Sequence, residues 1–182
     1  MNLLLLGVVL WWGGHLFKRF APNARAGMGD RGRALAAALI LAGLVAMVLG
    51  YRGADYAHVF TPPVWGKHAN NLLMLLAVIT FGMGMAKGRL WTYIRHPMLT
   101  GVLLWGLAHL LVRGDLASVI LFGGLALWSL VEMAAINRAE GQWVRPAPGA
   151  PKRDLALLGI GAAMYVLIAF LHLRAGFAVF GA

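Results

Sequence analysis

The chain has 182 residues, of which 61% are hydrophobic and only 12% are charged, and its mean hydropathy is +0.77. Soluble domains are roughly half apolar and about a quarter charged, so this composition excludes a soluble globular enzyme and a disordered chain. The net charge of +10 does not indicate a nucleic-acid partner, because the basic residues lie between long apolar runs and not on a polar surface. The sequence therefore predicts an integral protein of the lipid bilayer.

Six apolar runs approach the length of roughly 20 residues that a transmembrane helix needs. The first run has no basic residue before it, so we expect a span and not a signal peptide. We predict an all-α, polytopic helical bundle that forms a single transmembrane domain over residues 1–182. Its spans are expected at about 2–20, 33–51, 68–86, 97–113, 115–136 and 154–175.

Local signals mark several helix ends. Pro97 suits the first turn of the fourth span, because proline lacks the N–H that is unpaired there. Asp115 follows Gly114 and is expected to cap the N-terminus of the fifth span. Three prolines, Pro146, Pro148 and Pro151, are expected to break the chain before the sixth span.

The basic residues indicate the orientation. Twelve Lys and Arg residues fall on one side of the predicted membrane and four on the other, and the richer side is normally cytoplasmic. This places both termini outside the cytoplasm. The cytoplasmic set is Lys18, Arg19, Arg25, Arg31, Arg33, Lys87, Arg89, Arg95, Arg138, Arg145, Lys152 and Arg153, and the opposite set is Arg52, Lys67, Arg113 and Arg174.

Histidines are the main candidates for metal chemistry, because the chain has no cysteine and imidazole is the remaining strong nitrogen ligand. Polar groups at membrane depth are costly and often functional. His15, His68, His109 and His172 lie within predicted spans, whereas His58 lies in a loop. Each membrane histidine either hydrogen-bonds a helix carbonyl or contributes to a cofactor site, and composition alone leaves both open.

Two of these histidines lie among glycines and tryptophans. His15 ends the run Trp-Trp-Gly-Gly-His at residues 11–15, and His109 ends the run Trp-Gly-Leu-Ala-His that starts at Trp105. Small residues permit close helix approach, and a porphyrin needs an apolar slot with an axial imidazole. These runs are therefore candidate cofactor-binding segments.

The cytoplasmic start of the fourth span forms a basic corner. Arg95 and His96 precede Pro97 at a helix N-terminus, which attracts anions. We expect this corner to bind a phosphate, carboxylate or propionate group, or to anchor lipid headgroups. Glu132, an acid within the fifth span, must be paired or protonated, and its expected partner is Arg95, Arg138 or a histidine.

The sequence resembles the NnrU family over nearly its whole length. The likeness includes His15 with Phe20-Ala21-Pro22 and Arg25, and Tyr51-Arg52. Its most specific part runs from residue 95 to 124 and reads Arg95-His96-Pro97-Met98-Leu99-Thr100-Gly101, Trp105-Gly106-Leu107-Ala108-His109, Gly114-Asp115-Leu116-Ala117-Ser118 and Phe122-Gly123-Gly124.

The resemblance implies a bacterial inner-membrane protein associated with denitrification. A related plant protein, 15-cis-zeta-carotene isomerase, uses haem b, and its axial ligands correspond to His15 and His109. The plant enzyme has a cysteine three residues before the second ligand, where this chain has Gly106. A thiolate switch is therefore excluded here. The function implied is haem-b binding in support of redox or nitrogen-oxide metabolism; a haem-dependent carotenoid isomerase acting on a lipophilic small molecule is the alternative.

Helix position favours other histidine pairs. His15 lies about four residues from the cytoplasmic end of its span and His109 about twelve, so at about 1.5 Å per residue their depths differ by about 12 Å. His96 is closer in depth to His15, whereas His68 and His172 are closer to His109. The resemblance nevertheless implies His15 and His109 as metal ligands. From the basic corner and the aromatic run, we expect Arg95, His96 and Trp105 to bind the cofactor as well.

A shorter likeness concerns isoprenylcysteine and phospholipid methyltransferases, which bind S-adenosylmethionine near the cytoplasmic face. Arg95, His96, Pro97 and Gly101 match their motif, with Glu132 as the acid, but the paired glutamates of those enzymes are missing. This likeness implies a shared architecture, and methyl transfer remains the second enzymatic alternative.

Overall fold

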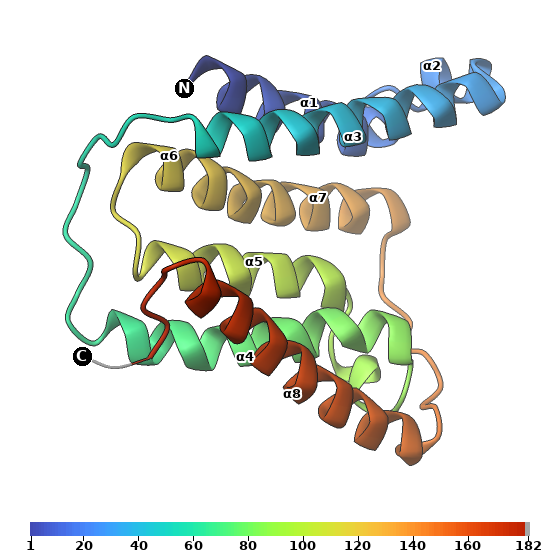
Figure 1. Ribbon diagram of the computed structural model, residues 1–182. Coiled ribbons are helices and arrows are strands. Elements are labelled where there is room, and N and C mark those ends of the chain that lie inside the picture. The colour runs from blue at the N-terminus through green and yellow to red at the C-terminus, as the bar shows by residue number, and fades with distance from the viewer. Residues whose placement is uncertain (181–182) are drawn as a thin grey trace. The chain divides into compact units, whose positions relative to one another are not determined.

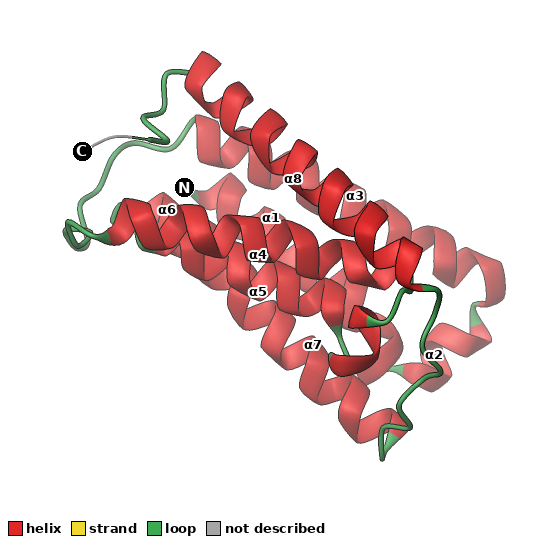
Figure 2. Cartoon of the chain, turned by 90° about the horizontal axis from the view of Figure 1, so that it is seen from below, coloured by secondary structure: helices red, strands yellow, loops and turns green. Residues whose placement is uncertain are grey.

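The computed structural model describes residues 1–180 and consists of helices joined by loops (Figure 2). Helical residues make up 76% of this described part. The described part has no strand beyond one isolated antiparallel bridge between His58 and Asp115. The predicted all-α fold class is confirmed.

Within residues 1–180, five helical runs are long and apolar enough to cross a membrane. A sixth apolar helix, α5, has 14 residues, which is shorter than a full span of about 20. Large apolar side chains stay exposed on the helices, including Leu41 at 62% and Val166 at 64%, which suits contact with lipid. The protein is a multi-pass membrane protein, close to the predicted six spans. The five runs are α1 (Asn2–Phe20), α3 (Gly29–Arg52), α4 (Gly66–Ala86), Leu116–Glu140 and α8 (Pro151–Arg174).

The helices belong to two compact units. Unit 1 contains residues 1–61 and 114–141, and unit 2 contains residues 62–113 and the chain from Gln142 onward. The chain thus leaves unit 1 after α3 and returns to it after α5. The single transmembrane domain expected from the sequence stays a prediction, and each unit is described by itself.

In unit 1, α1 and α3 lie side by side (Figure 1) and approach closely through glycines. A Cβ atom at Gly7 would lie 2.5 Å from the backbone nitrogen of Met47 and 2.8 Å from the carbonyl oxygen of Gly43. Ordinary non-bonded contacts between carbon atoms are about 3.5–4.0 Å. Small residues therefore bring the two backbones together, as is typical of helices in lipid, where burial gives no hydrophobic driving force.

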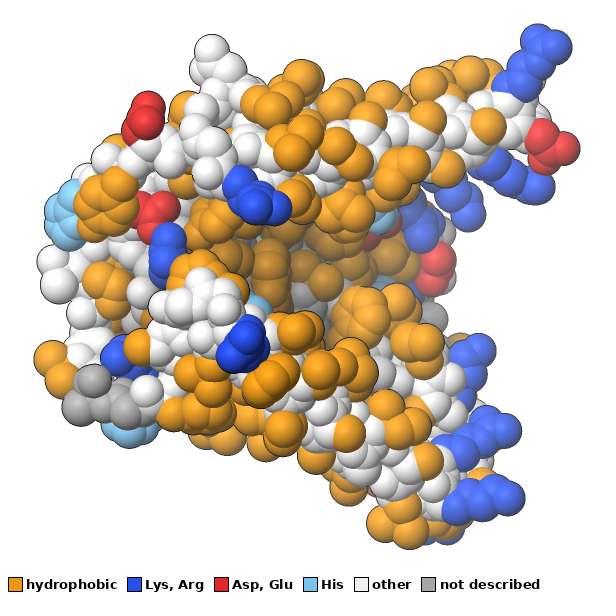
Figure 3. Space-filling model, in the orientation of Figure 1, with side chains coloured by type: hydrophobic (Ala, Val, Ile, Leu, Met, Phe, Trp, Pro, Cys, Tyr) orange, Lys and Arg blue, Asp and Glu red, His pale blue; other side chains and the backbone are white. Residues whose placement is uncertain are grey.

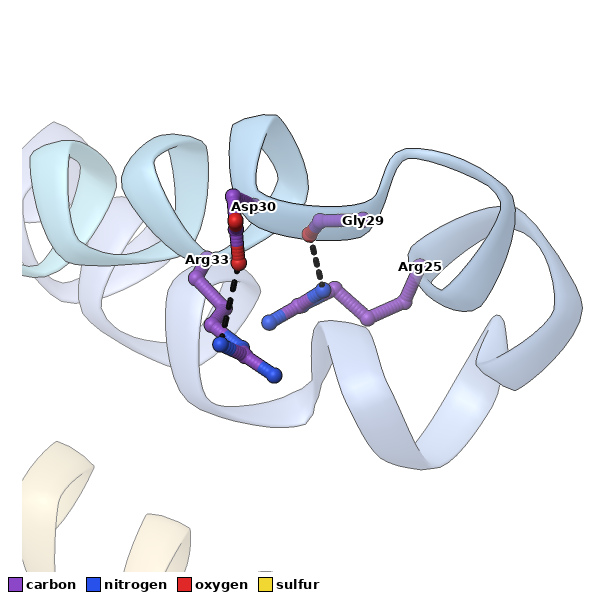
Figure 4. Close-up of polar contacts among 4 residues, drawn as sticks. All are labelled: Arg25, Gly29, Asp30 and Arg33. Carbon is purple, nitrogen blue, oxygen red and sulfur yellow. Dashed lines mark hydrogen bonds and ion pairs between the residues drawn. The ribbon is translucent and has the colours of Figure 1, made fainter.

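A short helix, α2 (Pro22–Gly27), connects α1 to α3. Figure 4 shows Arg25 donating from Nη1 to the carbonyl oxygen of Gly29 at 3.0 Å, and Arg33 paired with Asp30 at 2.9 Å. The carboxylate of Asp30 lies in the first turn of α3, where its negative charge interacts favourably with the helix dipole and stabilises the helix. As a result, α3 begins four residues before the start that the sequence predicts.

The N-terminus of the run Leu116–Glu140 is capped as predicted. The Oδ1 atom of Asp115 accepts the backbone N–H of Ser118 at 2.9 Å, and Oδ2 accepts its hydroxyl at 2.8 Å. The hydroxyl groups of Ser118 and Tyr51 lie 2.9 Å apart. These bonds satisfy donors that the first helical turn leaves unpaired.

This run is not uniformly α-helical. The short helix α6 (Leu116–Ser118) passes into a π-helical turn (Val119–Gly123) before α7 (Gly124–Glu140). The indole N–H of Trp12 on α1 donates to the carbonyl oxygen of Gly124 at 3.2 Å. A π turn shifts the register of the residues that follow it, and it thereby sets the face that α7 presents to α1.

In unit 2, α4 is the central helix, and α5 (Pro97–Leu110) and α8 pack on it (Figure 1). A Cβ atom at Gly101 of α5 would lie 2.7 Å from Cβ of Phe81 and 2.9 Å from the carbonyl oxygen of Ala77. A Cβ atom at Gly82 would lie 2.7 Å from Cδ1 of Leu157 on α8. Glycine again permits the close approach.

Prolines begin both outer helices of unit 2. Pro97 occupies the first turn of α5, as predicted, and Pro151 occupies the first turn of α8. From the sequence we expect Pro151 to break the chain before a helix near residue 154. That expectation is wrong, because proline has a suitable φ angle and needs no N–H at the first helical position.

The connection between α4 and α5 contains a 3₁₀ turn (Leu90–Tyr93). Two hydrogen bonds join this connection to α8. The carboxylate of Asp154 accepts the backbone N–H of Arg89 at 2.8 Å and that of Leu90 at 3.2 Å. The carboxylate also lies in the first turn of α8, where the helix dipole favours it.

Charged and apolar side chains separate along the helices. In Figure 3 hydrophobic side chains cover the sides of the helices in each unit. Lys and Arg gather in unit 1 at the end near α2, and in unit 2 at the end where α8 begins (Figure 3). This pattern fits apolar helix sides in lipid and basic loops in water.

Candidate functional site

His15 lies in an aromatic group formed by α1 and α7. Its Nδ1–H donates to the carbonyl oxygen of Trp11 at 3.0 Å. The imidazole centroid lies 4.4 Å from the ring centroid of Trp11 and 4.6 Å from that of Trp128. Because a carbonyl can only accept, the proton of the neutral imidazole is on Nδ1 and the lone pair is on Nε2. Metal-binding histidines are held by the same kind of bond.

An ion pair lies one turn further along the same two helices. The Nε atom of Arg19 is 3.6 Å from Oε1 of Glu132, and Nη2 of Arg19 is 3.6 Å from Oε1 of Glu140. Glu132 is only 8% exposed, so its charge requires a partner. That partner is Arg19, which differs from the three partners expected from the sequence.

The spacing of residues could have revealed this contact. Trp11, His15 and Arg19 recur every four residues and therefore share one face of α1. Trp128 and Glu132 share a face of α7 in the same way. In the sequence, Arg19 indicated the end and the orientation of the first span, and no signal was drawn from Trp128.

Three buried polar atoms of this group have no hydrogen-bond partner among the described residues. They are Nε1 of Trp11, Nε1 of Trp128 and Oε2 of Glu132. Buried polar atoms are nearly always paired. Two donors and one acceptor beside aromatic rings therefore suit a ligand with a flat apolar body and a polar edge.

His109, near the end of α5, repeats the local arrangement of His15. Its Nδ1–H donates to the carbonyl oxygen of Trp105 at 2.9 Å, and the two ring centroids lie 5.2 Å apart. The neutral ring again has its lone pair on Nε2. The structure thus brings Trp105 and His109 together as predicted from the sequence.

His172 on α8 faces His109 within unit 2. Its Nδ1–H donates to the carbonyl oxygen of Ile168 at 2.8 Å, and its ring centroid lies 6.4 Å from that of His109. Phe177 lies 5.9 Å from His172, because the chain turns back at Gly176, where φ is +87°. Such a φ angle favours glycine.

Arg95 and His96 lie at the opposite end of α5. His96 is the residue before Pro97, and both side chains are half-buried. His109 follows His96 by thirteen positions, which is about 20 Å along a helix. The His109 imidazole and this basic corner are therefore separate features of unit 2. Trp105 lies beside the His109 imidazole and not at the corner.

The remaining predicted residues fall elsewhere. His15 belongs to unit 1, whereas His109, Trp105, Arg95 and His96 belong to unit 2. His68 is exposed in the first turn of α4, and His58 is exposed beside Tyr56, with the Tyr56 hydroxyl 3.4 Å from its Nδ1.

The histidines can be compared with what an ion held by side chains and a haem iron each require. Residues 1–180 contain no group of three or more His, Cys, Asp or Glu side chains that could hold a metal ion. Haem iron already has four porphyrin nitrogens and needs only one or two axial ligands. His15 and His109 each offer a fixed imidazole with an indole beside it, so the residues present suit this cofactor.

A family model described as NnrU protein matches residues 3–179. The chain belongs to the NnrU family. Membership over nearly the whole chain confirms the resemblance seen in the sequence, and it accords with the membrane-spanning helices. No curated protein and no solved structure is significantly similar to the chain.

Proposed function

We propose that this NnrU-family protein binds haem b through its membrane histidines and supports redox or nitrogen-oxide metabolism, as in denitrification. The observation that carries the proposal is the repeated arrangement at His15 and His109. In each, Nδ1–H bonds the carbonyl oxygen of a tryptophan four residues earlier, at 3.0 Å and 2.9 Å. Each ring is therefore held in the tautomer that presents Nε2 to a metal.

His109 and His15 are the axial ligands that family membership suggests. Trp105 and Trp11 provide flat apolar surfaces beside these rings, and such surfaces suit a porphyrin. Arg95 and the N-terminus of α5 would attract an anionic group at the other end of that helix.

Haem would supply one-electron chemistry. The protein's own residues hold the imidazoles, exclude water with aromatic rings and balance charge. Gly106, one turn before His109, contributes no thiol. The chain therefore offers no thiolate ligand.

We place the protein in the bacterial inner membrane with both termini in the periplasm. The excess of Lys and Arg on one side supports this orientation.

The test is an absorption spectrum of the purified protein in detergent, oxidised and reduced, with haem quantified per chain. We expect a Soret band, and His109→Ala should remove most of the haem. His58→Ala is the matched control, since His58 is an exposed loop residue. A wild-type protein without a Soret band after expression with excess haem would refute the proposal.

A further inference from the structure

Exposed Lys and Arg side chains gather at the end of unit 2 where α8 begins (Figure 3). The segments 87–95 and 142–155 at this end contain one acid, Asp154, and its carboxylate accepts the backbone N–H groups of Arg89 and Leu90. Five of the cations form no ion pair with any residue between 1 and 180. This basic cluster consists of Lys87, Arg89, Arg145, Lys152 and Arg153, and its charge remains available to a ligand.

Backbone contacts join the segments that carry the basic cluster. The backbone N–H of Gly149 donates to the carbonyl oxygen of Gly88 at 2.8 Å. A Cβ atom at Gly149 would collide with the carbonyl oxygen of Lys87, so the two segments touch backbone to backbone. The carboxylate of Asp154 joins the start of α8 to the same loop. A ligand therefore meets cations on an ordered framework, which lowers the entropy lost on binding.

Aromatic rings of the 3₁₀ turn Leu90–Tyr93 orient two members of the basic cluster. The Nζ atom of Lys87 lies 5.9 Å from the ring centroid of Trp91, and the guanidinium carbon of Arg145 lies 5.3 Å from that of Tyr93. A cation within about 6 Å of an aromatic face is attracted by it. Because a ring has no net charge, both cations keep their full charge while their side chains are held in place.

The basic cluster lies at the depth of lipid headgroups. Arg153 in the first turn of α8 and Arg174 at its last residue are 21 positions apart, which is about 32 Å along a helix and matches a hydrocarbon core of about 30 Å. Apolar side chains are exposed next to the cations, with Leu155 at 72% and Tyr93 at 66%. Cations mixed with exposed apolar and aromatic side chains are typical of the boundary between acyl chains and headgroups.

We propose that the basic cluster is a binding site for phospholipids with an anionic headgroup. The guanidinium of Arg145 donates N–H groups to the phosphate oxygens, which its planar geometry suits, and the other four cations supply positive potential. Charge complementarity selects an anionic over a zwitterionic lipid, because the cluster repels the ammonium group of a zwitterionic headgroup. This site requires no cofactor, so its test is independent of the proposed haem function.

The experiment measures lipid binding to the full-length protein in detergent by native mass spectrometry. The probes are phosphatidylglycerol, phosphatidylethanolamine with the same acyl chains, and soluble glycerol phosphate. We expect phosphatidylglycerol to bind at least about tenfold more tightly than phosphatidylethanolamine, since each neighbouring cation contributes about fivefold to the attraction of an anionic lipid. Equal binding of the two lipids overturns the proposal and leaves an acidic soluble partner as the occupant of this surface. Glycerol phosphate that binds as tightly as phosphatidylglycerol also overturns it.

Substitutions test whether the basic cluster is the site. Arg145→Gln and Lys87→Gln should each weaken the first phosphatidylglycerol bound by about fivefold. Arg174→Gln is the matched control, because it removes one exposed cation at the other end of α8 and should leave this binding unchanged. Equal losses in Arg174→Gln and Arg145→Gln would show attraction by net charge alone and overturn the site.

Tyr93 provides a second test that leaves the net charge unchanged. Tyr93→Ala removes the ring beside Arg145 and should weaken phosphatidylglycerol binding by about two- to fivefold. Tyr93→Phe keeps the ring face and should bind as the wild-type protein does. If Tyr93→Ala also binds like the wild-type protein, the ring does not orient Arg145 for a headgroup, and this part of the proposal is wrong.

Discussion

Replacing Gly7 by alanine tests whether close backbone contact between α1 and α3 holds unit 1 together. The added Cβ atom would lie 2.5 Å from the backbone nitrogen of Met47 and 2.8 Å from the carbonyl oxygen of Gly43. Contacts of about 3.5 Å are the normal minimum, so the helices must separate by roughly 1 Å along this stretch. Backbone atoms cannot move aside as a flexible side chain can.

The expected loss of stability follows from two opposing effects. Overpacking of this kind costs about 1–3 kcal/mol, and alanine regains up to about 1 kcal/mol over glycine in a helix. We therefore expect Gly7→Ala to lower the free energy of unfolding by about 1–2 kcal/mol. Gly13→Ala on the same helix should be neutral or stabilising, because no atom lies within 4 Å of a Cβ there.

The assay is reversible unfolding in mixed micelles of increasing sodium dodecyl sulfate, followed by circular dichroism. A difference of 1.4 kcal/mol corresponds to a tenfold change in the unfolding equilibrium constant, which such titrations resolve. If Gly7→Ala proves as stable as Gly13→Ala, the inferred glycine contact does not contribute to the fold.

Three further predictions concern charges. Arg19→Ala should destabilise unit 1 by about 3–5 kcal/mol, because it leaves the buried carboxylate of Glu132 unpaired; Arg33→Ala, which breaks an exposed pair, should change stability by less than about 1 kcal/mol, and equal effects in the same titration would contradict this. Asp154→Ala should accelerate tryptic cleavage after Arg89, since the loop loses two backbone hydrogen bonds; an unchanged rate argues against that role. Reporter fusions in the connection after α3 should show periplasmic activity and those after α7 cytoplasmic activity; the reverse pattern would refute the orientation.

The membrane class and most helix positions could be predicted from the sequence, because lipid imposes simple rules on an entire chain. A helix in lipid needs a long apolar run, and that requirement is visible in composition. Local chemistry at Pro97 and Asp115 was equally visible, since both act on their own first turn. These predictions need no knowledge of which helices touch.

Contacts between helices were harder to predict. The pairing of Arg19 with Glu132 joins residues more than a hundred positions apart, and the sequence offered several equally charged alternatives. The start of α8 was placed too late because Pro151 was considered as a helix breaker and not as a first-turn residue. Both errors concern residue types with two structural roles. An arginine can mark the cytoplasmic side or pair with a buried acid, and a proline can end a helix or begin one.

The candidate site was predicted in part. The sequence placed Trp105 beside His109 and grouped His172 with His109 by depth, and the structure brings these residues together. It gave no sign of Phe177, which reaches His172 only because the chain turns back at Gly176. The assignment of His15 and His109 to one iron stays a prediction.

The π-helical turn Val119–Gly123 sets the register of the helix that follows it. Such a turn contains one residue more than an α turn. If the same residues were wound as a regular α-helix, everything after them would be rotated by about 100°, and Trp128 and Glu132 would point away from His15 and Arg19. Deleting one residue there should instead convert the π turn into an α turn and leave the later residues in place. In an alignment of NnrU sequences, a one-residue gap at this place should therefore coincide with the same residues opposite the first helix.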